Sequence, residues 1–433
     1  MTVRVAVLGS EGAKGANDQA GRRAEEMSND LEGSFKSSGY SWRLFCGAGV
    51  IESDLKAAVE RAGAKRAFVI CSPSINRKTN TVKRIAAAFG ERLAGVFDEA
   101  EKDSTYASVC AAKAAAVGAG ADLLIAVGGG SVIVAVRAVA IFMGESGDPF
   151  KLMSQYPEGG RPFSPRLSAP KLPIINIPTT PNSAVNRAGT GLKNPDIDHR
   201  MEYFDPKTRP QAIFFDDEVL LTTPVTILRS TATTVFAGVV GAVSHPASNP
   251  LVAGDQAQAF HLAHDAYVRL ATEPDDAGVR RDLALAAFLQ NRAEDDGRTL
   301  VRSGAFSGDY AVSTALHIRY PHVGQGESTS VLQAPAIRLA KDIEPTSAKR
   351  VAEALRVWRD GMSTRQAADA VADELAQLYQ ARGMPARLRD LDIGKDDLPE
   401  IAAETVKNFN ARASFRSADD RIANSLRLLE AAW

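Results

Sequence analysis

The residues that decide the fold are Leu123–Met143, with the sequence LLIAVGGGSVIVAVRAVAIFM. The pattern predicts a buried strand, a turn of three glycines and a serine, and then an apolar helix. Glycine lets the backbone approach a ligand closely at such a turn, and the free N–H groups of the helix start attract an anion. We therefore expect a diphosphate at Gly128, Gly129, Gly130 and Ser131, while a tight turn without a ligand stays the alternative.

On both sides of this turn, the first half of the chain alternates short β-rich runs with alanine-rich helical segments. Strand–helix alternation of this kind builds a parallel sheet with helices on both faces. The predicted helices are Ser53–Ala62 and Tyr106–Gly118. The predicted strands are Val3–Leu8, Arg66–Cys71, Leu93–Phe97, Leu123–Val127, Leu172–Ile177 and Gln211–Phe215.

After about Pro224 the strand signals fade, and apolar residues recur at i, i+3 and i+4 along several long segments. That spacing places them on one face of a helix and predicts an all-helical C-terminal domain, which begins between residues 217 and 226. The predicted helices are Ile227–Val243, Asp255–Leu270, Gly278–Asn291, Ser347–Trp358, Arg365–Arg382 and Ile422–Ala432.

Composition and charge limit the class of protein. The 433 residues are 45% hydrophobic and 24% charged, which is typical of a globular chain with more than one core. The 51 basic and 52 acidic residues leave a formal charge of −1, so we expect a small-molecule substrate and no nucleic acid or membrane as partner. Three scattered cysteines, an N-terminus without signal-peptide features and short apolar runs predict a cytoplasmic protein.

Several segments, in order along the chain, resemble the iron-containing alcohol dehydrogenase superfamily, and most closely its maleylacetate reductase branch. The likeness starts near residue 33, so we expect an N-terminal extension at 1–32, a dinucleotide-binding α/β domain at 33–222 and a helical domain at 223–433. The residues that carry the resemblance are Leu93–Asp98 (LAGVFD), Gly128–Ser131 (GGGS), Ile177–Thr180 (IPTT), His199–Pro210, Ala212–Pro224 and the tail Pro385–Trp433.

The resemblance implies that NAD(P)H binds the α/β domain and that chemistry takes place in the cleft between the two domains. It places Thr179, Thr180 and Asn182 along the cofactor, beside the glycine turn. We also expect the protein to be a homodimer.

A position after the second strand bears on the choice of cofactor. The family often carries an acidic residue there, which binds the ribose of NAD and repels a 2′-phosphate. Here the position is Ser72, and Arg77 and Lys78 follow closely. We expect NADPH to bind at least as well as NADH.

The chain departs from the family where a metal would bind. The usual ligands of Fe²⁺ or Zn²⁺ are one Asp and three His, and the first two of these positions fall on Thr234 and Gly238. In a later segment His322 matches one ligand, and Gln325 stands where the last histidine would be. One imidazole and one amide do not hold a divalent cation, so we expect no metal.

Without a metal, reduction of a carbonyl needs another group to polarise the oxygen and supply a proton. His317, Arg319 and His322 cluster within six residues, and histidine exchanges protons near cellular pH. We expect the two histidines to act in catalysis and the arginine to bind a substrate carboxylate. The alternatives are a half-buried helix histidine at 317 and a solvated charge at 319. Glu327 would either orient a histidine or pair with Arg319.

The favoured function is thus a metal-independent, NAD(P)-dependent reductase or dehydrogenase of a small carbonyl or alcohol compound, carboxylated or not. Two alternatives stay open, because the family's GGGSxxDxAK is changed at Val134 and Arg137 and its G-S-E after IPTT is Ser183-Ala184-Val185. One is a cofactor-using biosynthetic enzyme without net redox change, as in the dehydroquinate synthase relatives. The other is a protein that binds NAD(P) without catalysis.

Overall fold

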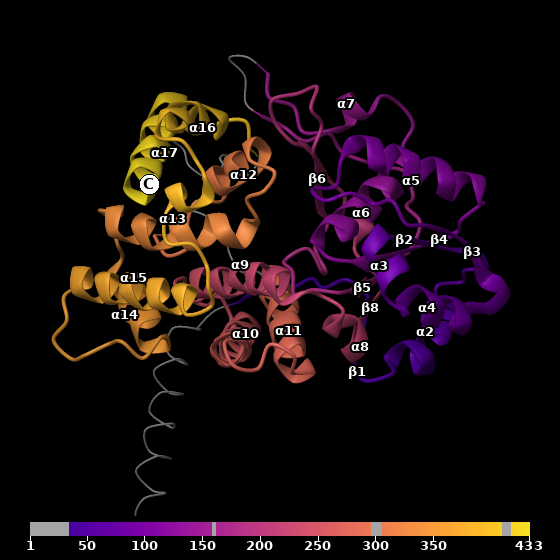
Figure 1. The fold of residues 1–433 in the computed structure, drawn as a ribbon, viewed down its shortest axis with the longest axis horizontal. Helices are drawn as coiled ribbons and strands as arrows, with labels where there is room; N and C mark the ends of the chain where they lie inside the picture. The colour runs from indigo at the N-terminus through magenta and orange to yellow at the C-terminus, as the bar shows by residue number, and fades with distance from the viewer. Residues whose placement is uncertain (1–33, 158–161, 296–304, 409–416) are drawn as a thin grey trace, which may run out of the picture.

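The computed structural model describes residues 34–157, 162–295, 305–408 and 417–433. Six parallel strands form one sheet in the order β1-β8-β5-β4-β2-β3, which confirms the predicted parallel sheet. Figure 1 shows this sheet and its helices on one side of the molecule and the helical half on the other. The strands are β1 (Arg43–Gly47), β2 (Ala67–Cys71), β3 (Leu93–Phe97), β4 (Leu123–Gly128), β5 (Ile174–Pro178) and β8 (Ala212–Asp216).

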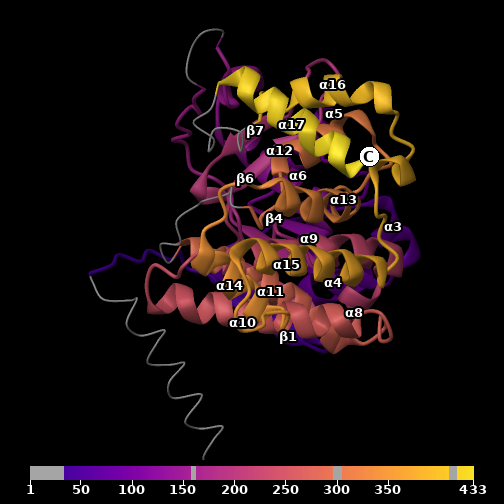
Figure 2. The same cartoon turned by 90° about the vertical axis from the view of Figure 1, so that its left-hand side faces the viewer.

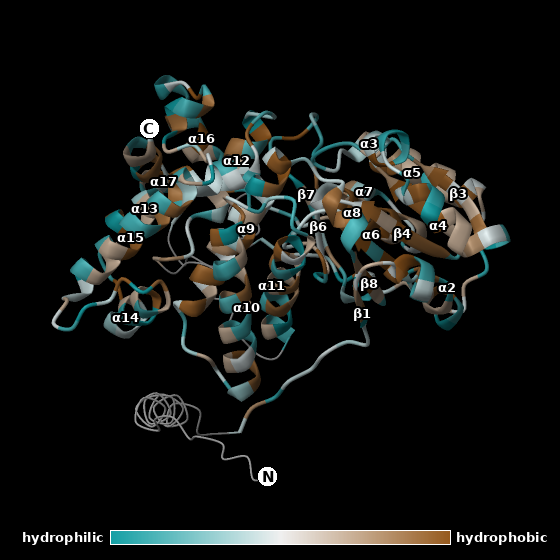
Figure 3. Ribbon diagram, turned by 60° about the horizontal axis from the view of Figure 1, so that its bottom comes forward, coloured by the Kyte–Doolittle hydropathy of each residue, from teal (hydrophilic) through white to brown (hydrophobic). Residues whose placement is uncertain are grey.

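The two faces of the sheet pack against separate sets of helices. Helices α5 (Tyr106–Gly118) and α6 (Gly130–Gly144) cover the face that holds the even-numbered residues of β4. Helices α2 (Val50–Arg61) and α4 (Thr81–Phe89) cover the face that holds its odd-numbered residues. Figure 3 shows hydrophobic residues concentrated on the central strands and on α6. Burial on both faces explains why β4 is apolar at every position up to its final glycine.

One strand of the sheet was not predicted. Strand β1 lies at an edge and pairs in parallel with β8. Its sequence, RLFCG, is short and mixed in polarity, so no alternating or continuous apolar pattern marks it. The predicted strand Val3–Leu8 lies outside the described residues. The other five predictions are confirmed within two residues of their ends.

A small antiparallel hairpin was also not predicted. It consists of β6 (Gly189–Leu192) and β7 (Met201–Phe204) and packs on α6, where the hydroxyl of Thr190 donates to the carbonyl oxygen of Val134 at 2.8 Å. The connection between its two strands reaches the other half of the molecule, because Asp198 forms an ion pair with Lys407.

The C-terminal half is helical, as predicted. Figure 2 shows that α12, α16 and α17 lie at one end of this half and α10, α11 and α14 at the other. Short helices α3 (Pro73–Lys78) and α7 (Pro149–Leu152) complete the first half. The helices that follow β8 are α8 (Asp217–Leu221), α9 (Val225–Val243), α10 (Pro250–Arg269), α11 (Ala277–Asp295), α12 (Tyr310–Arg319), α13 (Gln325–Leu339), α14 (Pro345–Ala354), α15 (Thr364–Gln380), α16 (Leu398–Glu404) and α17 (Ala418–Ala432).

Helix α14 ends earlier than predicted. The apolar spacing favoured a helix to Trp358, but Arg356 adopts a left-handed conformation with a φ of +61°. The amides of Val357 and Trp358 then both donate to the carbonyl oxygen of Ala352, which closes the helix.

Helix α9 lies at the centre of the helical half. Among the described residues it is the one helix long and apolar enough to cross a membrane by length and composition, and 56% of that apolar window is buried inside the protein. Its residues Leu228, Val235 and Phe236 are fully buried in the largest hydrophobic cluster. We therefore describe α9 as the core helix around which the helical half packs.

The predicted boundary between residues 222 and 223 falls between α8 and α9. The segment ahead of β1 also contacts the helical half, since the rings of Trp42 and Phe288 have centroids 4.8 Å apart. The amide of Ser38 donates to the carbonyl oxygen of Asp295 at 3.4 Å.

Candidate functional site

The glycine turn lies where β4 ends and α6 begins. Gly128 has a φ of +157°, and a Cβ there would lie 2.7 Å from Cγ2 of Val132, so the position does not accept a side chain without strain. Gly129 precedes the first turn of α6, and no side chain in the described ranges caps that helix. The first amides of α6 therefore have no side-chain acceptor, which is the arrangement that binds phosphate oxygens.

The end of β5 meets this turn. A Cβ on Gly129 would lie 3.4 Å from Oγ1 of Thr180, and one on Gly130 would lie 3.8 Å from Cβ of Asn182. The Thr180 side chain is buried, and its hydroxyl has no hydrogen-bond partner in the described part of the chain. A buried hydroxyl without a partner, beside uncapped helix amides, fits an oxygen-rich ligand such as a dinucleotide.

Thr179 and Asn182 shape the backbone here. The amide of Thr179 donates to the carbonyl oxygen of Gly128 at 3.1 Å. The Asn182 amide group donates to the carbonyl oxygen of Thr180 at 2.9 Å, and its oxygen accepts from the amide of Ala184 at 3.1 Å. Asn182 thus holds the turn after Thr180 in place.

Ser131 makes a contact that the sequence did not indicate. Its hydroxyl oxygen accepts from the amide of Asp103 at 3.1 Å, and its carbonyl oxygen accepts from the hydroxyl of Ser104 at 2.6 Å. Asp103 and Ser104 have φ values of +64° and +54°, a left-handed conformation that is costly for residues with a Cβ. The loop after β3 is therefore held against the glycine turn.

Ser72 lies at the end of β2, with its hydroxyl 3.0 Å from that of Ser74. A carboxylate that the sequence reasoning overlooked lies beside it at the end of β3. Asp98 accepts from Nδ2 of Asn76 at 3.0 Å and lies 3.5 Å from Nε of Arg77. One of the two cations expected to receive a 2′-phosphate thus already faces a carboxylate. An acidic residue directly after a strand was the available signal.

Arg319 and His322 face the C-terminal helices. Arg319 forms ion pairs with Asp397, Glu400 and Glu404 around α16. The His322 side chain is exposed, and its Nε2 lies 2.9 Å from the carbonyl oxygen of Leu391, to which it donates. Both side chains therefore have partners within the helical half.

His317 differs from these neighbours. Both ring nitrogens are buried and have no hydrogen-bond partner among the described residues. Burial lowers its pKa to about 3, and the positive charges of Arg200, Lys102 and Lys193 add to the effect. Burial thus favours a neutral imidazole at His317, in contrast to the expected proton exchange near its ordinary pKa.

Hydrogen bonds connect the loop after β3 to the turn that follows α12 and to the end of β6. Nζ of Lys102 donates to the carbonyl oxygen of Pro321 at 2.5 Å, in the turn that follows α12. The amide of Lys193 donates to the carbonyl oxygen of Ser104 at 3.3 Å. Since Ser104 and Asp103 also bind Ser131, this loop contacts both the glycine turn and the turn that follows α12.

Comparison with known proteins decides the family. The profile of iron-containing alcohol dehydrogenases matches residues 42–217, and that of the family's C-terminal domain matches residues 230–432. The chain belongs to the iron-containing alcohol dehydrogenase family. It is an oxidoreductase acting on CH–OH or C=O groups, as its homologues are.

Individual members of the iron-containing alcohol dehydrogenase family share only about a quarter of their aligned residues with this chain. Lactaldehyde reductase of Escherichia coli is 25% identical to this chain, in an alignment that covers 72% of this chain and 78% of the reductase. Maleylacetate reductase of Burkholderia cepacia is 24% identical, and the alignment covers 84% of this chain and 89% of that reductase. The alcohol dehydrogenase of Oenococcus oeni has the same fold, with a TM-score of 0.78 and 20% identity over 93% and 100% of the two chains.

The family's metal does not fit the residues at the corresponding places. The hydroxyl of Thr234 donates to the carbonyl oxygen of Ser230 within α9. A Cβ on Gly238 would lie 2.7 Å from Nε2 of Gln290, so the end of this glutamine would have to move to admit a larger side chain. Gln325 is the first residue of α13. The described ranges contain no group of three or more His, Cys, Asp or Glu placed to hold a metal ion.

Glu327 takes neither of the two roles expected of it. Its Oε2 accepts from the hydroxyl of Ser230 on α9 at 2.5 Å. The helices approach closely here, because a Cβ on Gly326 would overlap the carbonyl of Ser230. Glu327 therefore fixes the start of α13 on α9, just beyond the turn that follows α12.

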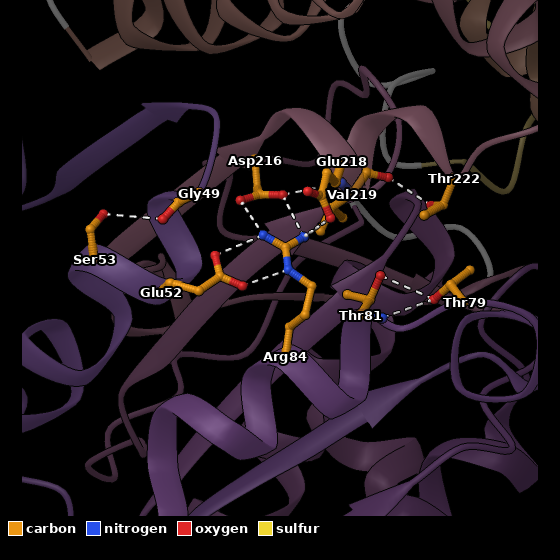
Figure 4. Close-up of polar contacts among 10 residues, drawn as sticks. All are labelled: Gly49, Glu52, Ser53, Thr79, Thr81, Arg84, Asp216, Glu218, Val219 and Thr222. Atoms are coloured by element: carbon orange, nitrogen blue, oxygen red, sulfur yellow. Dashed lines mark hydrogen bonds and ion pairs between the residues drawn. The ribbon is translucent and has the colours of Figure 1, made fainter.

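A cluster of one arginine and three carboxylates lies at the ends of β1 and β8 (Figure 4). Nη1 and Nη2 of Arg84 bind Oδ1 and Oδ2 of Asp216 at 2.9 and 3.1 Å. Nε of Arg84 donates to Glu52 at 2.6 Å, and Glu218 lies 3.2 Å from Nη1. The hydrogen bond from Arg84 lowers the pKa of Glu52, and this bond also raises the pKa of Arg84. Three carboxylates surround this guanidinium, so the cluster joins α2, α4 and β8.

Proposed function

We propose that this member of the family is a metal-independent, NAD(P)-dependent oxidoreductase of a small carbonyl or alcohol compound. The observation that carries the proposal is the buried, unpartnered hydroxyl of Thr180 beside the glycine turn. The loop after β3 supports it, because this loop contacts Ser131 of the glycine turn and Pro321 in the turn after the helix that carries the buried imidazole of His317.

Residues of the first half would hold the dinucleotide. The amides at the start of α6, at Gly130 and Ser131, would bind the diphosphate. The hydroxyl of Thr180 would donate to an oxygen of the cofactor, and Ser72 would face the adenosine ribose. The bound nicotinamide supplies or accepts the hydride.

His317 would act as a neutral hydrogen-bond donor. A neutral imidazole can donate one N–H to a carbonyl oxygen and so favour the negative charge that develops there. The cations of Lys193 and Arg200 would stabilise the same oxygen through space, in the place of a metal's charge. The proton that completes the reduction would come from solvent.

Substitution of Gly129 tests the cofactor site. Gly129→Val places a branched side chain in the path of the phosphates, so the dissociation constant for NADPH should rise by about tenfold or more in calorimetry. Gly254→Val on α10 is the matched control, because a Cβ there meets nothing within 4 Å. Equal affinity of both variants for NADPH would show that the turn is structural only.

The same assay separates the alternatives. Binding of NADPH without turnover of any carbonyl compound would favour a non-catalytic protein. Turnover without a net change in nicotinamide absorbance would favour a biosynthetic enzyme with no net redox change. The homodimer, the cytoplasmic location and the absence of a nucleic acid partner stay predictions.

A further inference from the structure

The side chain of Gln290 on α11 ends in an amide that makes no hydrogen bond to another described residue. Only 9% of the residue is exposed. The exposed part includes the amide, because neither its oxygen nor its nitrogen is among the fully enclosed polar atoms that lack a partner. A small molecule at this place would therefore meet one hydrogen-bond donor group and one acceptor that the protein does not use.

The other buried amide side chains that the structure describes in the helical half all have partners. Gln333 donates to the carbonyl oxygen of Phe306 at 2.7 Å. Asn291, the neighbour of Gln290, donates to the carbonyl oxygen of Ser183 at 3.1 Å. Because buried polar groups are nearly always hydrogen-bonded, the exception at Gln290 indicates a place where a ligand group binds.

This amide faces a side of α9 that is less buried than the rest of the helix. The residues along that side recur at intervals of three and four, and none of them is buried: Ile227, Thr231, Thr234 and Gly238. A Cβ on Gly238 would lie 2.7 Å from Nε2 of Gln290, so glycine at this position lets the amide lie close to α9.

The end of α11 also meets the segment that follows β5. Asn182, which lies beside Gly130 of the glycine turn, is followed by Ser183, and Ser183 accepts the hydrogen bond from α11. Nδ2 of Asn186 donates to the carbonyl oxygen of Phe288 at 3.1 Å. Figure 1 shows α9 and α11 where the helical half meets the sheet. The amide of Gln290 thus belongs to the helices that adjoin the expected cofactor site.

The order of the strands indicates which part of the cofactor comes to this side. Strand β4, which carries the glycine turn, lies between β2 and β5. With the adenosine ribose at Ser72, at the end of β2, the nicotinamide half leaves the diphosphate on the β5 side. That is the side on which α11 binds the segment after Asn182.

We propose that the amide of Gln290 binds the carboxamide of the nicotinamide ring. This inference rests on the proposed function, because it requires bound NAD(P)H. A primary amide carries a donor and an acceptor side by side, and the carboxamide of nicotinamide offers the complementary pair. Two hydrogen bonds between them hold the ring in one orientation, so Gln290 directs the hydride-carrying face of the ring toward the substrate.

The test compares NADPH with 2′-phospho-ADP-ribose, which has the same adenosine and diphosphate but no nicotinamide. Gln290→Met keeps the length of the side chain and removes both polar atoms, so the dissociation constant for NADPH should rise by about tenfold in calorimetry. The dissociation constant for 2′-phospho-ADP-ribose should change by less than about twofold. Gln258→Met, at an exposed glutamine on α10, should change neither value.

A cofactor analogue gives a second readout. Reduced 3-acetylpyridine adenine dinucleotide phosphate keeps the carbonyl oxygen of the carboxamide but lacks its N–H donors. The wild type should bind this analogue more weakly than NADPH, and Gln290→Met should bind the two about equally.

Unchanged NADPH affinity in Gln290→Met would overturn the inference. An equal weakening of NADPH and 2′-phospho-ADP-ribose would also overturn it, because the glutamine would then only support the packing of the site. If the wild type binds neither compound, the proposed function fails together with this inference. If the wild type oxidises NADPH and Gln290→Met binds it equally well, this inference alone fails.

Discussion

The charged groups around Arg84 and around His317 are built in opposite ways. Around Arg84, three carboxylates bind one guanidinium, and Asp216 among them is completely buried. Around His317, three cations gather without a carboxylate partner in the described part of the chain. The first arrangement stabilises the folded protein through its ion pairs, whereas the second leaves a buried imidazole neutral because the charges near it are all positive.

The largest expected effect is a difference in the free energy of unfolding between two arginine variants, one at Arg84 and one near His317. Arg84→Met leaves the buried carboxylate of Asp216 without its bidentate partner, so the free energy of unfolding should fall by about 3–5 kcal/mol. Arg200→Met removes a cation that repels its neighbours, so the change should stay within about 1 kcal/mol. Denaturation with guanidinium chloride measures both changes in the free energy of unfolding.

Arg92→Met is the control for the substitution itself. Arg92 forms an exposed ion pair with Glu60 at 3.0 Å, and such pairs contribute less than about 1 kcal/mol. If Arg84→Met costs no more than Arg92→Met, the ion pairs of the cluster in Figure 4 do not stabilise the fold more than an exposed pair does.

A smaller effect should appear in the pH dependence of stability. The pKa of His317 is about 3 in the folded protein, below its ordinary value of about 6.5, so the unfolded chain binds a proton that the folded protein does not. Stability is therefore fully present above about pH 6.5 and falls as the pH drops toward the folded pKa. Between pH 7 and pH 5 the wild type should lose about 2 kcal/mol more than His317→Gln.

His322→Gln serves as the matched control for this measurement, because His322 is an exposed histidine on the following turn. A wild type and His317→Gln with parallel stability curves would contradict the neutral, buried imidazole.

The smallest expected effect is that of a chelator. If the cations around His317 supply the positive charge that a metal supplies elsewhere in the family, EDTA should leave the rate of NADPH oxidation unchanged within error. Elemental analysis should find no stoichiometric iron or zinc. One metal per chain, with activity lost to EDTA and restored by Zn²⁺ or Fe²⁺, would contradict two statements. These are the match of Thr234 and Gly238 to the family's ligand positions and the proposed role of His317.

Local patterns in the sequence predicted much of the fold. The apolar run at Leu123–Val127 and the glycines after it identified the central strand and turn, because a strand buried on both faces shows in its own residues. The edge strand β1 and the hairpin of β6 and β7 have short, mixed sequences, so no periodicity marked them. Their positions depend on contacts with β8 and α6, which a local pattern does not contain.

The candidate site was harder to predict for the same reason. The glycine turn, Thr180 and Asn182 come from neighbouring strand ends, and they meet as a parallel sheet requires. His317 meets cations that lie more than 100 residues earlier in the chain, and its near neighbours Arg319 and His322 point to other partners. Proximity in sequence was therefore misleading around α12.

The packing of Gln290 against Gly238 has a consequence for any attempt to build a metal site on α9. A histidine at position 238 would bring its Cβ within 2.7 Å of the Gln290 amide, so the end of the glutamine side chain would have to move aside. A smaller residue in place of the glutamine would free that space but leave a gap beside Gly238. A designed ligand pair at positions 234 and 238 would therefore need position 290 to be chosen together with it.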